Sequence, residues 1–200
     1  RPSNSTGFVI RALAASPSAN LTEWQTSTGS VRARITSAGQ FSDPAGLPES
    51  DNNQRFGPGC LTSLTTGTGN CAFGRNVMAD TTSGAGNMGF GQVVLEKLTS
   101  GNFNMGIGPS ALTTLTVGSN NVAVGVSALS TAISSSSCVA LGQQALASAT
   151  TASNCVGIGD TALLGVTTGG TNIGIGASSG SNITTGTDNT IIGTTADTTA

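Results

Sequence analysis

Glycine recurs at every seventeenth position along most of this chain. The recurring positions are Gly57, Gly74, Gly91, Gly108, Gly125, Gly142, Gly159, Gly176 and Gly193. A unit this short cannot bury a core of its own, so successive units must stack on one another. This period limits the fold to a stack of short coils in which equivalent residues form columns.

A second column lies four positions before each repeated glycine. It holds Asn70, Asn87, Asn104, Asn121, Asn172 and Asn189, with Cys138 and Cys155 in the two remaining coils. Identical amide side chains that stack in register can hydrogen-bond to one another along the stack. We therefore predict an asparagine ladder in which two coils carry cysteine in place of the amide.

The residues before each repeated glycine alternate between large and small, as in Val122, Ala123 and Val124. Apolar residues two positions apart indicate a short β-strand, and no window of the chain has the spacing of an amphipathic helix. The pattern predicts an all-β protein. In it, eight 17-residue coils over residues 56–200 form a parallel β-solenoid, or β-roll, with rungs about 4.8 Å apart.

The small residue between the two large ones indicates a second packed face on each strand. This position holds Ala or Gly in seven of its eight places and never a charged residue, whereas a solvated strand face usually carries polar side chains. We expect one face of the strand to lie inside the coil and the other to pack against a neighbouring copy. The expected assembly is a homotrimer, and the alternation leaves open which face meets the partner.

Composition excludes several classes of function. Only 8% of residues are charged, and there is no histidine, so a Ser-His-Asp relay and His-ligated zinc are both excluded. Seven basic residues against nine acidic ones give no footprint for nucleic acid, and no run is long enough for membrane insertion. We expect no enzyme activity, no cofactor and no metal, and a chain that is a fragment or a processed product.

The segment before the repeat, residues 1–55, lacks the 17-residue period. Residues 21–25 and 31–35 have strand patterns, and Ser27–Ser30 between them is a glycine-containing turn, which together predict a β-hairpin module over residues 1–41. Residues 42–55 combine two prolines with charged residues, which is typical of a linker into the solenoid.

Three groups of side chains admit a sharper interpretation. Cys138 and Cys155 are one repeat apart, at a Cα separation that a disulfide tolerates, although unbonded thiols fit the asparagine slot better. Asp80 and Glu96 would suit a glycosidase only if a cleft brought the two carboxylates together, and isolated solvated charges are the better interpretation. A column that begins Thr65, Thr82, Thr99 and Thr116 resembles a feature of ice-binding solenoids, on a narrow face.

Two segments carry a family resemblance. NLTEWQTSTGSVRARITSAGQF is similar to the shaft units of bacteriophage tail fibres, and NNVAVGVSAL looks like the 17-residue repeats of such fibres. The repeat also resembles the shorter repeats of trimeric autotransporter adhesin heads. The resemblance implies an elongated homotrimeric β-fibre that serves attachment.

From the repeat and this resemblance we expect a rigid spacer in a viral tail or head fibre. The implied partners are two further copies of the chain, other fibre, baseplate or capsid proteins of the virion, and a host receptor reached through flanking segments. The alternative is the head of a trimeric adhesin on a bacterial cell surface.

Overall fold

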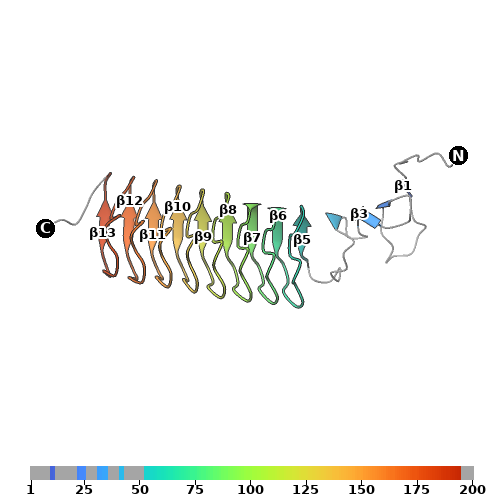
Figure 1. Ribbon diagram of the computed structural model, residues 1–200, viewed down its shortest axis with the longest axis horizontal. Coiled ribbons are helices and arrows are strands. Elements are labelled where there is room, and N and C mark those ends of the chain that lie inside the picture. Colours follow the sequence, from blue (N-terminus) through green and yellow to red (C-terminus); the bar gives the residue numbers. More distant parts are fainter. Residues whose placement is uncertain (1–9, 12–21, 26–30, 36–40, 43–51, 195–200) are drawn as a thin grey trace.

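The computed structural model describes residues 10–11, 22–25, 31–35, 41–42 and 52–194. The regular elements of these residues are all β-strands, and they form one four-stranded and one nine-stranded sheet (Figure 1). The nine-stranded sheet belongs to the repeat region.

The four strands before the repeat pair antiparallel in chain order. They are β1 (Ile10–Arg11), β2 (Thr22–Gln25), β3 (Val31–Ile35) and β4 (Phe41–Ser42). Glu23 pairs with Arg34 in the β2–β3 register. The predicted turn Ser27–Ser30 lies outside the described residues, as do residues 43–51 of the predicted linker.

The repeat forms a parallel β-solenoid, as the 17-residue period predicts, and its strands lie side by side in sequence order (Figure 1). The strands are β5 (Gln54–Phe56), β6 (Cys71–Arg75), β7 (Met88–Gln92), β8 (Met105–Ile107), β9 (Val122–Val124), β10 (Val139–Leu141), β11 (Val156–Ile158), β12 (Ile173–Ile175) and β13 (Thr190–Ile192). Each strand pairs with the next at an offset of one repeat, so Val122 lies beside Val139. The sheet starts at Gln54, inside the predicted linker.

The segments that connect the strands are also paired from coil to coil. The Leu112 N–H donates to the Ala128 carbonyl at 3.0 Å, and the Thr116 N–H donates to the Ile133 carbonyl at 2.9 Å. Hydrogen bonds of this kind recur on every side of the coil, which satisfies the backbone of the turns without helices. The whole circumference of the coil is thus held in the register of the sheet.

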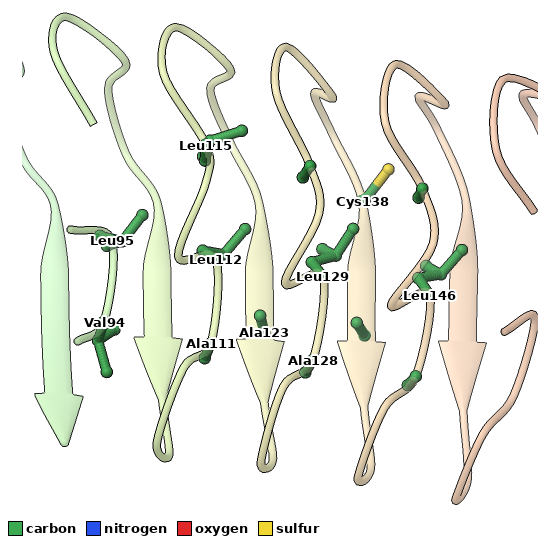
Figure 2. Packing of buried hydrophobic residues seen from close by; sticks show 14 of the residues in the cluster. Val94, Leu95, Ala111, Leu112, Leu115, Ala123, Ala128, Leu129, Cys138 and Leu146 are labelled. Atoms are coloured by element: carbon green, nitrogen blue, oxygen red, sulfur yellow. The ribbon is translucent and has the colours of Figure 1, made fainter. Parts of the chain in front are cut away.

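The core is a thin column between the sheet and the opposite turn segment. Its largest members recur once per coil and are fully buried, and Leu95, Leu112, Leu129 and Leu146 stack in successive coils (Figure 2). The middle residue of each strand faces them, and Ala123 and Ala140 are completely buried. The small middle residues therefore lie inside the coil, and the large ones flanking them face outward.

The repeated glycine lies near the end of each strand, in a conformation that other residues avoid. Gly74 has φ near +137°, and a Cβ at this position would overlap the carbonyl oxygen of Gly91 in the next coil. Both the dihedral angle and the close approach require glycine. The strict period in the sequence follows from these two constraints: a φ between +112° and +141° recurs at all nine glycines, and the close approach of the next coil recurs at most of them.

Candidate functional site

The asparagine column is an internal ladder of hydrogen bonds. Asn104 donates from its backbone N–H and from Nδ2 to Oδ1 of Asn87, at 2.9 and 3.0 Å, and its Nδ2 also donates to the Gly118 carbonyl at 2.9 Å. Asn87 and Asn121 make the same three contacts one coil away on either side. Because Asn70, Asn87, Asn104, Asn121 and Asn172 are all buried, the ladder is part of the core.

The ladder extends beyond the residues that the period identified. Asn53 accepts from the Asn70 backbone N–H at 2.8 Å and from Asn70 Nδ2 at 3.0 Å. At the other end, Asn189 donates from its backbone N–H and from Nδ2 to Oδ1 of Asn172, at 3.1 and 2.8 Å. Asn53 lies one repeat before Asn70. The sequence could have identified it by this spacing, but the residues around Asn53 do not follow the other columns of the repeat.

Cys138 and Cys155 take over the contacts of the asparagines that they replace. The Cys138 N–H donates to Asn121 Oδ1 at 3.0 Å, and the two thiols donate to the carbonyls of Ala152 and Gly169, at 3.4 and 3.5 Å. Both are free thiols and fully buried. They hold the same slot as asparagine, without a covalent bond.

These two thiols also contact one another. The interaction between the two side chains raises the pKa of Cys138 and lowers the pKa of Cys155, and hydrogen bonds from the backbone of Asn172 and Thr171 also favour the Cys155 thiolate. The two thiols therefore lose their protons as a coupled pair.

The outward face of the parallel sheet is apolar along most of its length. We call it the outer sheet face and define it by the first and third strand positions: Met88, Met105, Val122, Val139, Val156 and Ile173 in one column, and Phe73, Phe90, Ile107, Val124, Leu141, Ile158, Ile175 and Ile192 in the other. None of these side chains is fully buried, and Phe73 is 46% exposed. The columns are about 7 Å apart, and the eight rungs from β6 to β13 extend for about 34 Å along the axis of the solenoid.

Aromatic rings stack at one end of the outer sheet face. The ring centroids of Phe56 and Phe73 are 4.8 Å apart, and those of Phe73 and Phe90 are 5.6 Å apart, with interplanar angles of 12° and 20°. The strand register places the rings one above another. The ring faces therefore contact each other, and the ring edges point away from the sheet. This geometry suits packing against another apolar surface.

The charged side chains of the middle coils form an exposed ion pair. Lys97 Nζ lies 3.0 Å from the Asp80 carboxylate, and both side chains are about half exposed. The hydrogen bond to Asp80 raises the pKa of Lys97. Asp80 is therefore partnered with a cation one full repeat away and not with the carboxylate of Glu96.

The threonine column lies on a different edge of the coil. The hydroxyls of Thr65, Thr82, Thr99 and Thr116 each donate to the carbonyl of the equivalent residue in the next coil, at 2.9 to 3.1 Å. The hydroxyl hydrogens are thus donated to carbonyls of the same chain. This column strengthens the register between coils along one edge.

Within the part of the chain that the structure describes, no three His, Cys, Asp or Glu side chains gather as a metal site would require. The same residues include no helix with the length and apolar character of a membrane span. No family model, curated protein or solved structure matches this chain. The outer sheet face is the strongest candidate for a functional surface because its apolar side chains lie next to one another on successive rungs, with Phe73, Met88, Ile107, Ile175 and Ile192 exposed.

Proposed function

We propose that this chain is a structural segment of a homotrimeric viral fibre or spike, in which it acts as a rigid spacer in host attachment. Two further copies of the chain cover the outer sheet face, and the solenoid holds a receptor-binding element away from the virion. Other fibre, baseplate or capsid proteins of the virion are the partners at its ends.

The outer sheet face carries this proposal. Single exposed apolar residues are common on soluble proteins, but a continuous strip of valine, isoleucine, leucine, phenylalanine and methionine from β6 to β13 marks an interaction surface. The strip has no charged side chain, so a partner can cover it without desolvating an ion.

A second copy of the same chain fits this surface better than an unrelated protein would. The strip has one side-chain layer per rung, and another copy presents layers with the same spacing. Three such faces can meet around one axis with phenylalanine beside phenylalanine and valine beside valine, as interfaces between identical subunits require. The coil-to-coil hydrogen bonds and the asparagine ladder supply the stiffness of a spacer.

The experiment measures the solution mass of the chain by light scattering, on the parent and on two charged variants. Val124→Lys places a cation in the centre of the outer sheet face. Val126→Lys is the matched control because Val126 is 47% exposed and occupies a column that holds Arg75 and Asp160 in other coils. Each variant is checked for parent-like circular dichroism.

We expect the parent and Val126→Lys to have about three times the 19.5 kDa mass of one chain, and Val124→Lys to be monomeric. The assembled forms should resist protease for much longer than the monomer does. A folded parent of monomeric mass would overturn the proposal.

The head of a trimeric adhesin on a bacterial cell surface is a second candidate. It is favoured by a largely polar edge of the coils, where exposed threonine and serine side chains such as Thr66, Ser83 and Ser100 would remain accessible in a trimer. Binding of the trimer to immobilised host matrix protein would support the adhesin, and its absence would favour the spacer.

A further inference from the structure

The thiols of Cys138 and Cys155 have the same orientation in adjacent coils. Cys138 is one of the core residues in Figure 2, and Cys155 holds the same slot one coil later. Each Sγ lies near the carbonyl 14 positions later, at 3.4 and 3.5 Å, and near the carbonyl two positions earlier, at 3.6 and 3.5 Å. Because these contacts match, the two sulfur atoms are related by one rung, which is about 4.8 Å.

This separation suits a metal ion held in line between two sulfur atoms. A metal–thiolate bond is about 2.3 Å long, so two sulfur ligands on opposite sides of one ion are about 4.6 Å apart. An ion could therefore be bound with little change in either side chain. A disulfide, in contrast, needs the two sulfur atoms about 2.05 Å apart, so at least one side chain would have to rotate.

The two coils that carry cysteine differ from the others in two further columns. Six positions before the cysteines lie Ala132 and Ala149, where the other coils carry leucine, valine, isoleucine or threonine. Three positions before the cysteines lie Ser135 and Ala152, where the other six coils carry glycine.

The three columns meet in the core. In an earlier coil, a Cβ on Gly101 would lie 2.7 Å from Leu98 Cδ1 and 3.2 Å from Asn104 Nδ2. By this equivalence, Ser135 lies between Ala132 and Cys138. Alanine in place of leucine thus leaves room next to the sulfur atoms in both coils.

Ser135 supplies a polar group that the solenoid itself does not use. Its side chain is fully buried, and Oγ has no hydrogen-bond partner among the described residues. A buried hydroxyl without a partner is costly. Since Ser135 lies next to Cys138, its hydroxyl can donate to a thiolate there.

The backbone also favours negative charge on both sulfur atoms. Hydrogen bonds from the backbone of Cys155 and Asn154 favour the Cys138 thiolate, and the backbone of Asn172 and Thr171 does the same for Cys155. A buried charge is tolerated when it is hydrogen-bonded in this way.

The ligand set selects the class of ion. Thiolate sulfur binds soft ions in preference to magnesium or calcium. Zinc takes four ligands, and among the residues that the structure describes no third His, Cys, Asp or Glu side chain joins the pair. Two thiolates without further ligands suit an ion that accepts two-coordinate geometry.

We propose that Cys138 and Cys155 bind one soft monovalent ion of the copper(I) class between their sulfur atoms. On binding, both thiols release their protons to solvent and each sulfur forms one bond to the ion, without electron transfer. Both ligands come from one chain and lie inside the coil. The site is therefore independent of the proposed trimer and of the outer sheet face.

The experiment adds silver nitrate to the full, reduced chain in chloride-free buffer. Ag(I) is the probe because it shares the preference for sulfur and two-coordinate geometry and stays in one oxidation state. Cys60→Ala with Cys71→Val removes the other two thiols, and each substitution introduces a residue that other coils carry in the same column. This double variant is the reference chain, and its fold is checked by circular dichroism.

We expect the reference chain to bind one Ag(I), as measured by native mass spectrometry, and X-ray absorption to find two sulfur neighbours around the silver. Because both thiols are completely buried, the ion enters when a coil opens transiently, so binding should be slow. Affinity is therefore measured after prolonged incubation, by competition with a soluble thiol.

Serine variants assign the ligands, since a hydroxyl has nearly the shape of a thiol and can donate to the same carbonyl. Cys138→Ser and Cys155→Ser, each made in the reference chain, should weaken binding by at least about 100-fold, because even an outer partner of a metal ligand typically contributes 10- to 100-fold. Cys138→Ser with Cys155→Ser in the otherwise unchanged parent should bind one Ag(I) fewer than the parent, which tests the site without the reference substitutions.

Three results would overturn the proposal. The first is a folded reference chain that binds no Ag(I). The second is a single serine variant that binds as tightly as the reference chain, since one thiol would then suffice. The third is a silver ion with only one sulfur neighbour.

Discussion

Val94 packs directly against the backbone of Gly106: a Cβ on Gly106 would lie 2.5 Å from Val94 Cγ1. Two coils later along the chain the equivalent pair is Ala128 and Ala140, both fully buried. The turn residue and the strand residue 12 positions after it thus share one volume in the core. Where the turn residue is valine, as at Val77 and Val94, the strand residue is glycine.

This relationship predicts the outcome of a double-mutant cycle. Gly106→Ala should destabilise the solenoid by about 1–3 kcal/mol because the added methyl overlaps Val94. Val94→Ala alone should cost roughly 2 kcal/mol through lost burial and a small cavity. The double variant recreates the alanine pair found elsewhere, so it should be clearly more stable than the sum of the two costs implies.

Chemical denaturation of the four proteins in the cycle provides the free energies of unfolding. The four proteins can be compared if their free energies of unfolding fall with denaturant concentration at similar slopes. A change in the denaturation midpoint then reports a change in stability. If the two costs simply add, Val94 and Gly106 do not share a volume and the packing relationship is wrong.

Gly180 and Ile191 reverse the usual sizes at the last described coil. Leucine or methionine fills the position of Gly180 in the other coils, and alanine or glycine fills that of Ile191 in most of them. A Cβ on Gly180 would lie 3.0 Å from Ile191 Cδ1, so the isoleucine occupies the space that leucine fills elsewhere. Gly180, which departs from the sequence pattern, is therefore compensated within its own coil.

We expect Ile191→Ala to cost about 2–4 kcal/mol because the cavity next to Gly180 stays empty. The exchange Gly180→Leu with Ile191→Ala should recover most of this loss, since it recreates the pair Leu129 and Ala140 found three coils earlier. Thermal unfolding of the three proteins measures the effect. A double variant no more stable than Ile191→Ala alone would contradict the compensation.

The sequence predicts the solenoid because the same steric constraint returns in every coil. The steric constraint at Gly74 and the amide contacts at Asn104 return in most coils, so the columns are visible without coordinates. The sequence does not show which face of the strand points into the core. Alternation of large and small residues shows two faces, but only the narrow cross-section of the coil decides that Ala123 points inward and Val124 outward.

One column of the outer sheet face shows another limit of sequence reasoning. Cys71, Met88 and Met105 follow one another at the period of the repeat, yet the strand position that they share holds valine or isoleucine in four other coils. A column in which sulfur-containing residues are followed by β-branched ones is not recognised as a repeat. Its meaning depends on which face it occupies, which the strand register and burial provide.

The two kinds of repeated left-handed glycine should respond differently to substitution. Gly74→Ala should cost at least about 3 kcal/mol, because its φ near +137° and the overlap with Gly91 both exclude a side chain. Gly69→Asn should be nearly neutral, since φ is +67°, the nearest atom to a Cβ lies 3.9 Å away, and Asn120 has a similar φ in the same column.

Denaturation midpoints of these two glycine variants measure the contrast. Parent-like stability of Gly74→Ala would show that the carbonyl of the next coil can move away, and the rigid stacking described for the solenoid would be wrong at this position. Gly69→Asn serves as the control for an added side chain in a left-handed turn.

The ladder predicts that cysteine is a better substitute for asparagine than alanine is. Asn104→Ala should cost about 2–4 kcal/mol, because it leaves the Gly118 carbonyl and Asn87 Oδ1 short of donors and the Asn121 amide without its acceptor. Asn104→Cys should cost less, since a thiol can donate to the same carbonyl, as Cys138 does to Ala152. Free energies of unfolding under reducing conditions give the order of the two variants.

The reverse substitution tests the same ladder from the other side. Cys138→Asn with Cys155→Asn would make the ladder continuous from Asn53 to Asn189, with two more side chains able to hydrogen-bond to their neighbours. Each net hydrogen bond typically stabilises a protein by about 1 kcal/mol, so the double variant should unfold at a higher temperature than the parent. A lower unfolding temperature would mean that the core around these two coils has adapted to sulfur, and that the slots of the ladder are not equivalent.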